Sequence, residues 1–149
     1  MRKTAIVLFG GLFLIVAGVL SAQDATEDPA LYAVGALGAS NLYTSYFLLG
    51  TLADGYATAA YTAQFAEELA RDVIGLNESS IEVLELLLAE TSLAGSDKVL
   101  IADMVTAHQL LIEQAFGLLA YVNDSADTEQ WFRSRREAWE LISVLLDLD

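Results

Sequence analysis

The fold is decided by residues 28–67, which read DPALYAVGALGASNLYTSYFLLGTLADGYATAAYTAQFAE. Between its two ends, Asp28 and Glu67, this stretch carries a single charged residue, Asp54. Its apolar and small residues recur at helical spacing, which predicts helices that are covered on more than one side. Asp28 followed by Pro29 predicts the start of the first helix, because aspartate accepts hydrogen bonds from first-turn N–H groups and proline lacks the N–H that would go unpaired.

The first predicted helix, from Pro29 to about Ala53, has two seams displaced by one position. Both step by four and three residues, the spacing that keeps one helix face on a partner in left-handed bundles. A helix that is apolar on two sides is either central in its domain or uses one side for another chain, a lipid or a ligand. The first seam is Leu31, Gly35, Gly38, Leu42, Ser45, Leu49 and Leu52. The second, here called the Tyr/Gly face, is Tyr32, Ala36, Ala39, Tyr43, Tyr46 and Gly50.

Turn and cap signals divide the rest of the chain into further helices. Asp54-Gly55 predicts a turn, and Gly75 predicts a left-handed cap at the end of a second helix. The second helix carries alanines that match the first seam, so the two should form a tight antiparallel hairpin. The expected ranges are a second helix to about Ile74, a third from Asn77–Ser80 to Gly95, a fourth capped by Ser96 and ending near Val122, and a last one beginning at Asp127.

These signals predict an all-α protein, an antiparallel four- to five-helix bundle preceded by a signal peptide. Residues 28–149 form its single domain, residues 23–27 are a disordered leader, and the fourth and fifth helices are expected to be outer walls. In residues 1–22, Arg2 and Lys3 form a basic start, an apolar run follows, and Ser21-Ala22 offers a cleavage site. An uncleaved anchor is the alternative, since about 17 apolar residues suffice to span a bilayer. The sequence therefore predicts a periplasmic or extracellular location.

The composition excludes several classes of function. The formal net charge is −14 and becomes −16 once Arg2 and Lys3 are removed, which disfavours nucleic acid and anionic membrane surfaces as partners. There is no cysteine, so disulfides, thiolate chemistry and covalent haem attachment are excluded. No nucleophile elbow or comparable catalytic set is present, so we expect no enzyme activity and no cofactor. In size, export signal and helix pattern the chain resembles small periplasmic helical bundles, including the cytochrome c-prime type, but it lacks their haem motif.

Three residues outside the Tyr/Gly face are candidates for ligand contacts. Met104 precedes His108 by one helical turn, and a thioether with an imidazole could hold copper(I) or a non-covalent haem. The alternative places both in the core, with the imidazole bonded to a carbonyl, tyrosine or carboxylate. Arg135 falls inside an apolar seam and could contact an anionic ligand group. It could also pair with Glu67 or Asp103, or extend outward beside a tryptophan.

Two functional hypotheses follow, and a third is weaker. The leading hypothesis is a non-enzymatic role in self-association, or in binding another exported protein, through the Tyr/Gly face, because tyrosine rings bury area while their hydroxyls remain satisfiable. Core packing of the same rings is its alternative. The second hypothesis is a carrier of a small hydrophobic or amphiphilic molecule in a cavity between the first helix and the later ones. Metal or haem binding through Met104 and His108 comes last, and membrane contact is expected only if residues 1–22 are retained.

Overall fold

The computed structural model describes residues 29–124 and 128–148, and no strand occurs among them. The helices are α2 (Pro29–Ala57), α3 (Ala63–Leu88), α4 (Gly95–Asn123) and α5 (Glu129–Leu145). The all-α prediction is therefore confirmed, and Pro29, the predicted start of the first helix, is helical and is the first described residue. The expected signal peptide, the leader and the cap at Asp28 lie outside the described residues. None of the described helices is long and apolar enough to cross a membrane.

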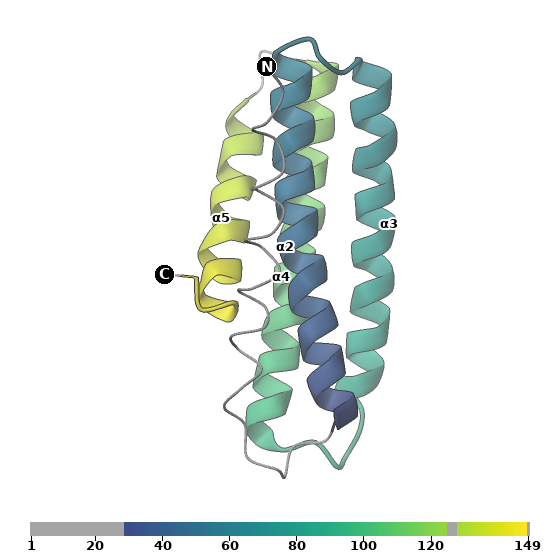
Figure 1. The fold of residues 1–149 in the computed structure, drawn as a ribbon, viewed down its shortest axis with the longest axis vertical. Helices are drawn as coiled ribbons and strands as arrows, with labels where there is room; N and C mark the ends of the chain where they lie inside the picture. Colours follow the sequence, from purple (N-terminus) through teal and green to yellow (C-terminus); the bar gives the residue numbers. More distant parts are fainter. Residues whose placement is uncertain (1–28, 125–127, 149) are drawn as a thin grey trace, which may run out of the picture. The chain divides into compact units, whose positions relative to one another are not determined.

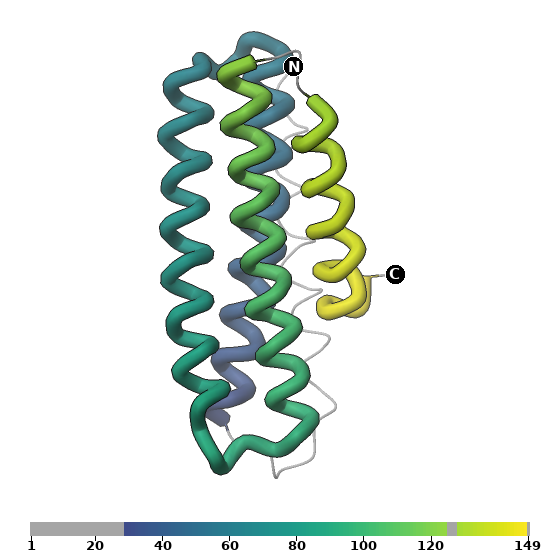
Figure 2. The backbone as a smooth tube through the Cα atoms, turned by 180° about the vertical axis from the view of Figure 1, so that it is seen from behind, coloured from purple at the N-terminus to yellow at the C-terminus, as the bar shows by residue number. Residues whose placement is uncertain are grey.

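The chain divides into two compact units, residues 1–33 and residues 34–149. The described part of the first unit is the beginning of α2, residues 29–33. In the second unit, successive helices run in alternating directions (Figure 1), and α4 lies between α3 and α5 (Figure 2). Helix α4 is therefore covered on two sides, although the sequence predicted an outer wall. Both of its sides are buried because it packs against α3 on one side and α5 on the other.

The connection between α2 and α3 lies later than the sequence predicted. Helix α2 continues through Asp54-Gly55 to Ala57, and the chain turns at Ala59, whose φ of 56° is in the left-handed region. Thr62 then caps α3, its hydroxyl accepting a hydrogen bond from the N–H of Phe65 at 3.2 Å. The Asp-Gly pair was misleading because its glycine serves packing rather than a turn: a Cβ on Gly55 would overlap the ring of Tyr61.

Gly75 does not end a helix, so the second and third predicted helices are one. Helix α3 runs on to Leu88, and no glycine in the described ranges has a positive φ. The buried face of α3 passes from Val73 to Asn77 and on to Leu84 without interruption. Packing of this face outweighs the local signals for a break, because helix propensity is only a weak determinant beside tertiary contacts.

The predicted start of the fourth helix was also displaced. Gly95, expected to close a helix, is the first residue of α4, and the N-cap residue is Ala94, which makes no side-chain capping bond. Ser96 is therefore not the cap; its hydroxyl lies 3.5 Å from a carboxylate oxygen of Asp97 instead. The last helix, α5, begins at Glu129, and Asp127, its predicted start, lies outside the described residues.

Two glycine replacements should change stability in opposite directions. Gly75→Ala should raise the free energy of unfolding by up to about 1 kcal/mol, since alanine is the better residue inside an exposed helix and no described atom lies within 4 Å of its Cβ. Gly117→Ala should lower it by about 1–3 kcal/mol, because its Cβ would lie 3.0 Å from the backbone of Trp131 and force α4 away from α5. Urea denaturation measures both, and a destabilising Gly75→Ala would contradict the uninterrupted α3.

Candidate functional site

A groove of about 360 Å³ opens between α2 and α3 and reaches α4 at its floor. Its volume falls within the range of about 300–1,000 Å³ that is usual for small-molecule sites. Helix α4 contributes a single residue, His108, which is fully buried. The other lining residues are Val34, Leu37, Gly38 and Asn41 of α2 and Leu76, Ser79, Ser80, Val83 and Leu84 of α3.

The rim of the groove is apolar and accessible to solvent. Leu37 is 72% exposed, Val83 is 59% exposed and Leu76 is 52% exposed. Covering apolar side chains that are this exposed removes them from water, which is energetically favourable. No charged residue lines the groove among the described parts of the chain. The site therefore offers mainly apolar contact, with the polar side chains of Asn41, Ser79, Ser80 and His108 among its lining.

A chain of buried and half-buried polar side chains runs beneath the groove from α3 to α2 and back. The side-chain Nδ2 of Asn41 donates to the hydroxyl of Ser80 at 2.8 Å, and the Ser45 hydroxyl donates to the side-chain Oδ1 of Asn41 at 3.2 Å. The Asn77 amide in turn donates to Ser45 at 3.4 Å. These contacts satisfy polar groups that would otherwise be costly inside a helical core.

The chain of hydrogen bonds ends at His108 and determines its tautomer. The Nδ2 of Asn77 donates to the carbonyl oxygen of Val73 at 2.7 Å, so its Oδ1 is the acceptor that lies 2.6 Å from His108 Nδ1. Burial lowers the pKa of His108 from 6.5 to about 4, which leaves the imidazole neutral at pH 7. Nδ1 therefore carries the proton, and Nε2 is an acceptor that is buried without a hydrogen-bond partner within the described ranges.

The C-terminal half of the Tyr/Gly face lies against α5. Tyr46 is only 7% exposed, and its ring centroid lies 4.9 Å from that of Trp139. Gly50 is buried because the guanidinium of Arg135 occupies the space beside it, where a Cβ would overlap Nη1. This half of the face is core packing in the single chain.

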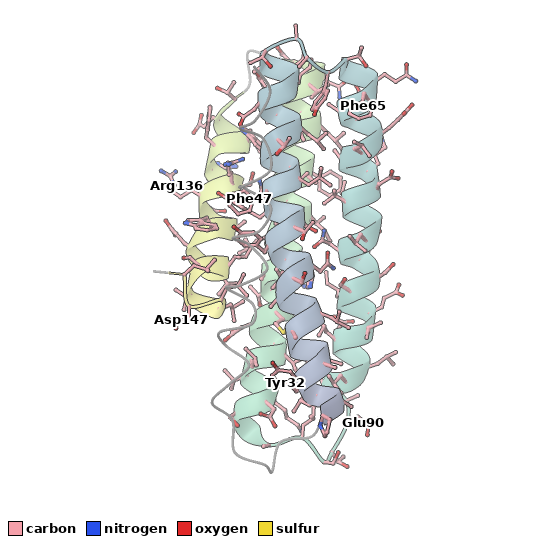
Figure 3. The ribbon with its side chains drawn as sticks, viewed as in Figure 1. Tyr32, Phe47, Phe65, Glu90, Arg136 and Asp147 are labelled. Carbon is pink, nitrogen blue, oxygen red and sulfur yellow. The ribbon has the colours of Figure 1, made fainter. Side chains whose placement is uncertain are left out.

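The N-terminal half of the Tyr/Gly face is more open. Tyr43 and Ala39 are half-buried, and Ala36 is exposed. The Tyr43 ring packs on Phe47, at 4.5 Å between centroids, and Figure 3 shows Phe47 on the side of α2 toward α5. Tyr32, in the first unit, is half-buried. None of these residues lines the groove, so the groove and the Tyr/Gly face are different surfaces of α2.

Arg135 is held by aromatic rings. Its guanidinium carbon lies 5.0 Å from the ring centroid of Tyr46 and 5.6 Å from that of Trp131, within the range of cation–π attraction. In the described part of the chain it forms no ion pair with Glu67 or Asp103. It is also absent from the groove lining, so an anionic ligand in the groove would not meet it.

Met104 and His108 are both buried on α4, one turn apart. The terminal methyl group of Met104 fills the space beside Gly38, where a Cβ would overlap it. The described residues contain no cluster of three or more His, Cys, Asp or Glu side chains that could hold a metal ion.

Comparison with known proteins adds no assignment. No protein-family model, no curated protein and no solved structure matches the chain. The function must therefore be argued from the geometry of the site.

Sequence reasoning missed the residues that make the floor of the site. Asn77 was interpreted as part of a helix start, although it follows Val73 by four residues on the apolar seam of the same helix. A polar residue at a seam position is a signal for a buried hydrogen bond. The same signal could have found Gln114, which is fully buried on α4 with neither amide atom paired among the described residues.

Proposed function

We propose that this protein is a non-enzymatic carrier that binds a small apolar or amphiphilic molecule in the groove between α2 and α3. The observation that supports it is the combination of exposed apolar side chains along the groove with an uncharged lining that includes the polar side chains of Asn41, Ser79 and Ser80. Sites for small molecules combine a mostly apolar wall with a few placed polar groups in this way. The proposal retains the export predicted from residues 1–22.

This role is preferred over self-association through the Tyr/Gly face. Half of that face is covered by α5 within one chain, which leaves Tyr46 and Gly50 unavailable to a partner. The groove rim, in contrast, leaves Leu37 and Val83 largely exposed. An apolar chain placed along the rim would remove this area from water, which stabilises a complex by about 25 cal/mol for each Å² buried.

The test is binding of the neutral dye Nile red to the full chain. Wild-type protein should bind one dye molecule saturably, and Val83→Glu should weaken binding by about tenfold or more, because a carboxylate at the rim must lose water when the groove fills. Leu86→Glu is the matched control: Leu86 is 73% exposed on the same helix but does not line the groove. Its affinity for the dye should stay within about twofold of wild type.

Light scattering on the same samples separates the carrier from a self-associating protein. The proposal expects the same oligomeric state in wild type, Val83→Glu and Leu86→Glu. A wild-type dimer that Val83→Glu dissociates would assign the rim to contact between copies of the chain. Equal loss of dye binding in both variants would also contradict the groove as the site.

A further inference from the structure

We infer that the groove between α2 and α3 is also the docking site for an amphipathic helix of a partner protein, whose basic residues lie along the α3 side of the groove. A helix seated there fills the groove, so such a partner would displace the ligand of the proposed carrier. The partner goes beyond the proposed function, and its docking does not depend on a small-molecule ligand.

Exposed apolar side chains form a row along α3. Leu76, Val83 and Leu86 are each more than half exposed, and Ser79 is exposed between the first two. Residues 76, 79, 83 and 86 step by three and four, so they lie along one side of the helix, here called the α3 stripe. One helix packs along another in left-handed bundles by the same steps. The α3 stripe therefore has the spacing of a helix–helix contact, although none of the described helices covers it.

The α3 stripe extends beyond the groove. Three of its four residues line the groove, and Leu37 of α2, which is also mostly exposed, lines the other side. Leu86, nearly one turn after Val83, is not a lining residue. A small molecule in the groove would leave Leu86 in water, whereas a helix along the stripe would cover the whole distance from Leu76 to Leu86, about 15 Å. Apolar grooves of this kind are docking sites for amphipathic helices.

The charged residues beside the α3 stripe are acidic. Neighbours on a helix surface lie three or four residues apart. Within α3, the charged residues at this distance from the stripe are Asp72, which precedes Leu76 by four, and Glu82, which precedes Leu86 by four. Both are exposed, and α2 has no charged residue before Asp54, which lies beyond the groove. A docked helix therefore meets carboxylates on its α3 side, where basic residues would complement them.

None of the described helices is itself such a basic helix. α2 has no basic residue, and α3 and α4 each have one lysine or arginine against several acids. α5 has three arginines but also three glutamates, and Arg135 packs against Tyr46 and Trp131 of its own chain. Two copies of the α3 stripe would bring like charges together in either orientation. The occupant is therefore a helix of another protein, which the net charge of −14 helps to attract.

The test is binding of two synthetic peptides to the full chain at pH 7 and low salt. Both are helices of about 18 residues with leucine at the a and d positions of the heptad, and the flanking e and g positions are lysine in one and glutamate in the other. Fluorescence anisotropy of the labelled peptides, below the concentration at which they self-associate, gives the affinities. The lysine peptide should bind about tenfold more tightly or better, and it should displace Nile red.

Three glutamate replacements separate docking on the α3 stripe from attraction to an acidic protein in general. Leu86→Glu adds negative charge, yet it should weaken binding of the lysine peptide by about fivefold or more, because an apolar contact is lost and a carboxylate must lose water. Val83→Glu should act in the same direction. Val144→Glu is the matched control: Val144 is comparably exposed on α5, and its replacement should change the affinity by less than about twofold.

The outcomes also distinguish the docking site from the proposed carrier. Equal affinity for the two peptides, unchanged affinity of the lysine peptide for Leu86→Glu, or dye that stays bound beside the peptide would each overturn the docking site and leave the carrier intact. Peptide binding that Leu86→Glu weakens, in a protein that binds no dye, would support the docking site and overturn the carrier. A wild-type dimer that Leu86→Glu dissociates would assign the stripe to a second copy of the chain and overturn the partner helix.

Discussion

Asn77→Ala should lower the free energy of unfolding by about 3 kcal/mol, because it removes the acceptor of a buried imidazole and leaves a space in the core. Asn77 is fully buried, and its side chain holds His108 at 2.6 Å, the carbonyl oxygen of Val73 at 2.7 Å and Ser45 at 3.4 Å. The alanine variant would leave both nitrogens of His108 unpaired. Urea denaturation followed by circular dichroism gives the difference.

The matched control for this replacement is Ser79→Ala on the same helix. Ser79 is exposed, and its hydroxyl donates only to the carbonyl oxygen of Gly75 at 2.9 Å. Its replacement should change the free energy of unfolding by no more than about 0.5 kcal/mol. If Asn77→Ala cost as little as Ser79→Ala, the network beneath the groove would not contribute to holding α2, α3 and α4 together.

Lowering the pH from 7 to 5 should reduce the free energy of unfolding by about 2 kcal/mol through His108 alone. The folded pKa of about 4 lies below the unfolded value of 6.5 because burial disfavours the charged ring. On acidification the unfolded chain therefore takes up the proton first. The stabilisation is complete above pH 6.5 and is lost as the pH falls toward 4, where the loss reaches about 3 kcal/mol.

His108→Asn isolates this effect from the carboxylates. The many acidic groups titrate in both proteins, so the difference between the two pH profiles reports His108. The wild type should lose about 2 kcal/mol more than the variant between pH 7 and pH 5. Parallel profiles would contradict a neutral, buried imidazole in the folded state.

Helical periodicity was sufficient to predict that the protein is all-α and which face of α2 is buried, but not where the helices end. The leucine seam of α2 is buried in its C-terminal half, at Leu42, Ser45, Leu49 and Leu52, as its spacing indicated. The boundaries at Asp54-Gly55 and Gly75 were wrong, since a local turn signal competes with the packing of a whole face and the neighbours that cover the face are not visible in sequence.

The site was less predictable than the fold. The alternatives for a core imidazole were a carbonyl, a tyrosine or a carboxylate; the partner is a carbonyl oxygen, but that of the Asn77 side chain, a residue that had been interpreted as part of a helix start. Similarly, Gly50 and Arg135 were treated as separate candidates, although the glycine makes room for the guanidinium. In both pairs the two members belong to different helices, and seam analysis describes one helix at a time.

The hydrogen bond between Asn77 and His108 also determines which turn of α3 stands beside which turn of α4. Most of the other buried residues of α3 and α4 are apolar, so a slip of one helix by a turn, about 5.4 Å, would still place apolar side chains against one another. After such a slip Asn77 would stand beside Met104 or Ile112, and a buried amide and imidazole would both lose their partners. This polar pair thus opposes a slip of α3 along α4, much as a single buried asparagine favours one register in a coiled coil.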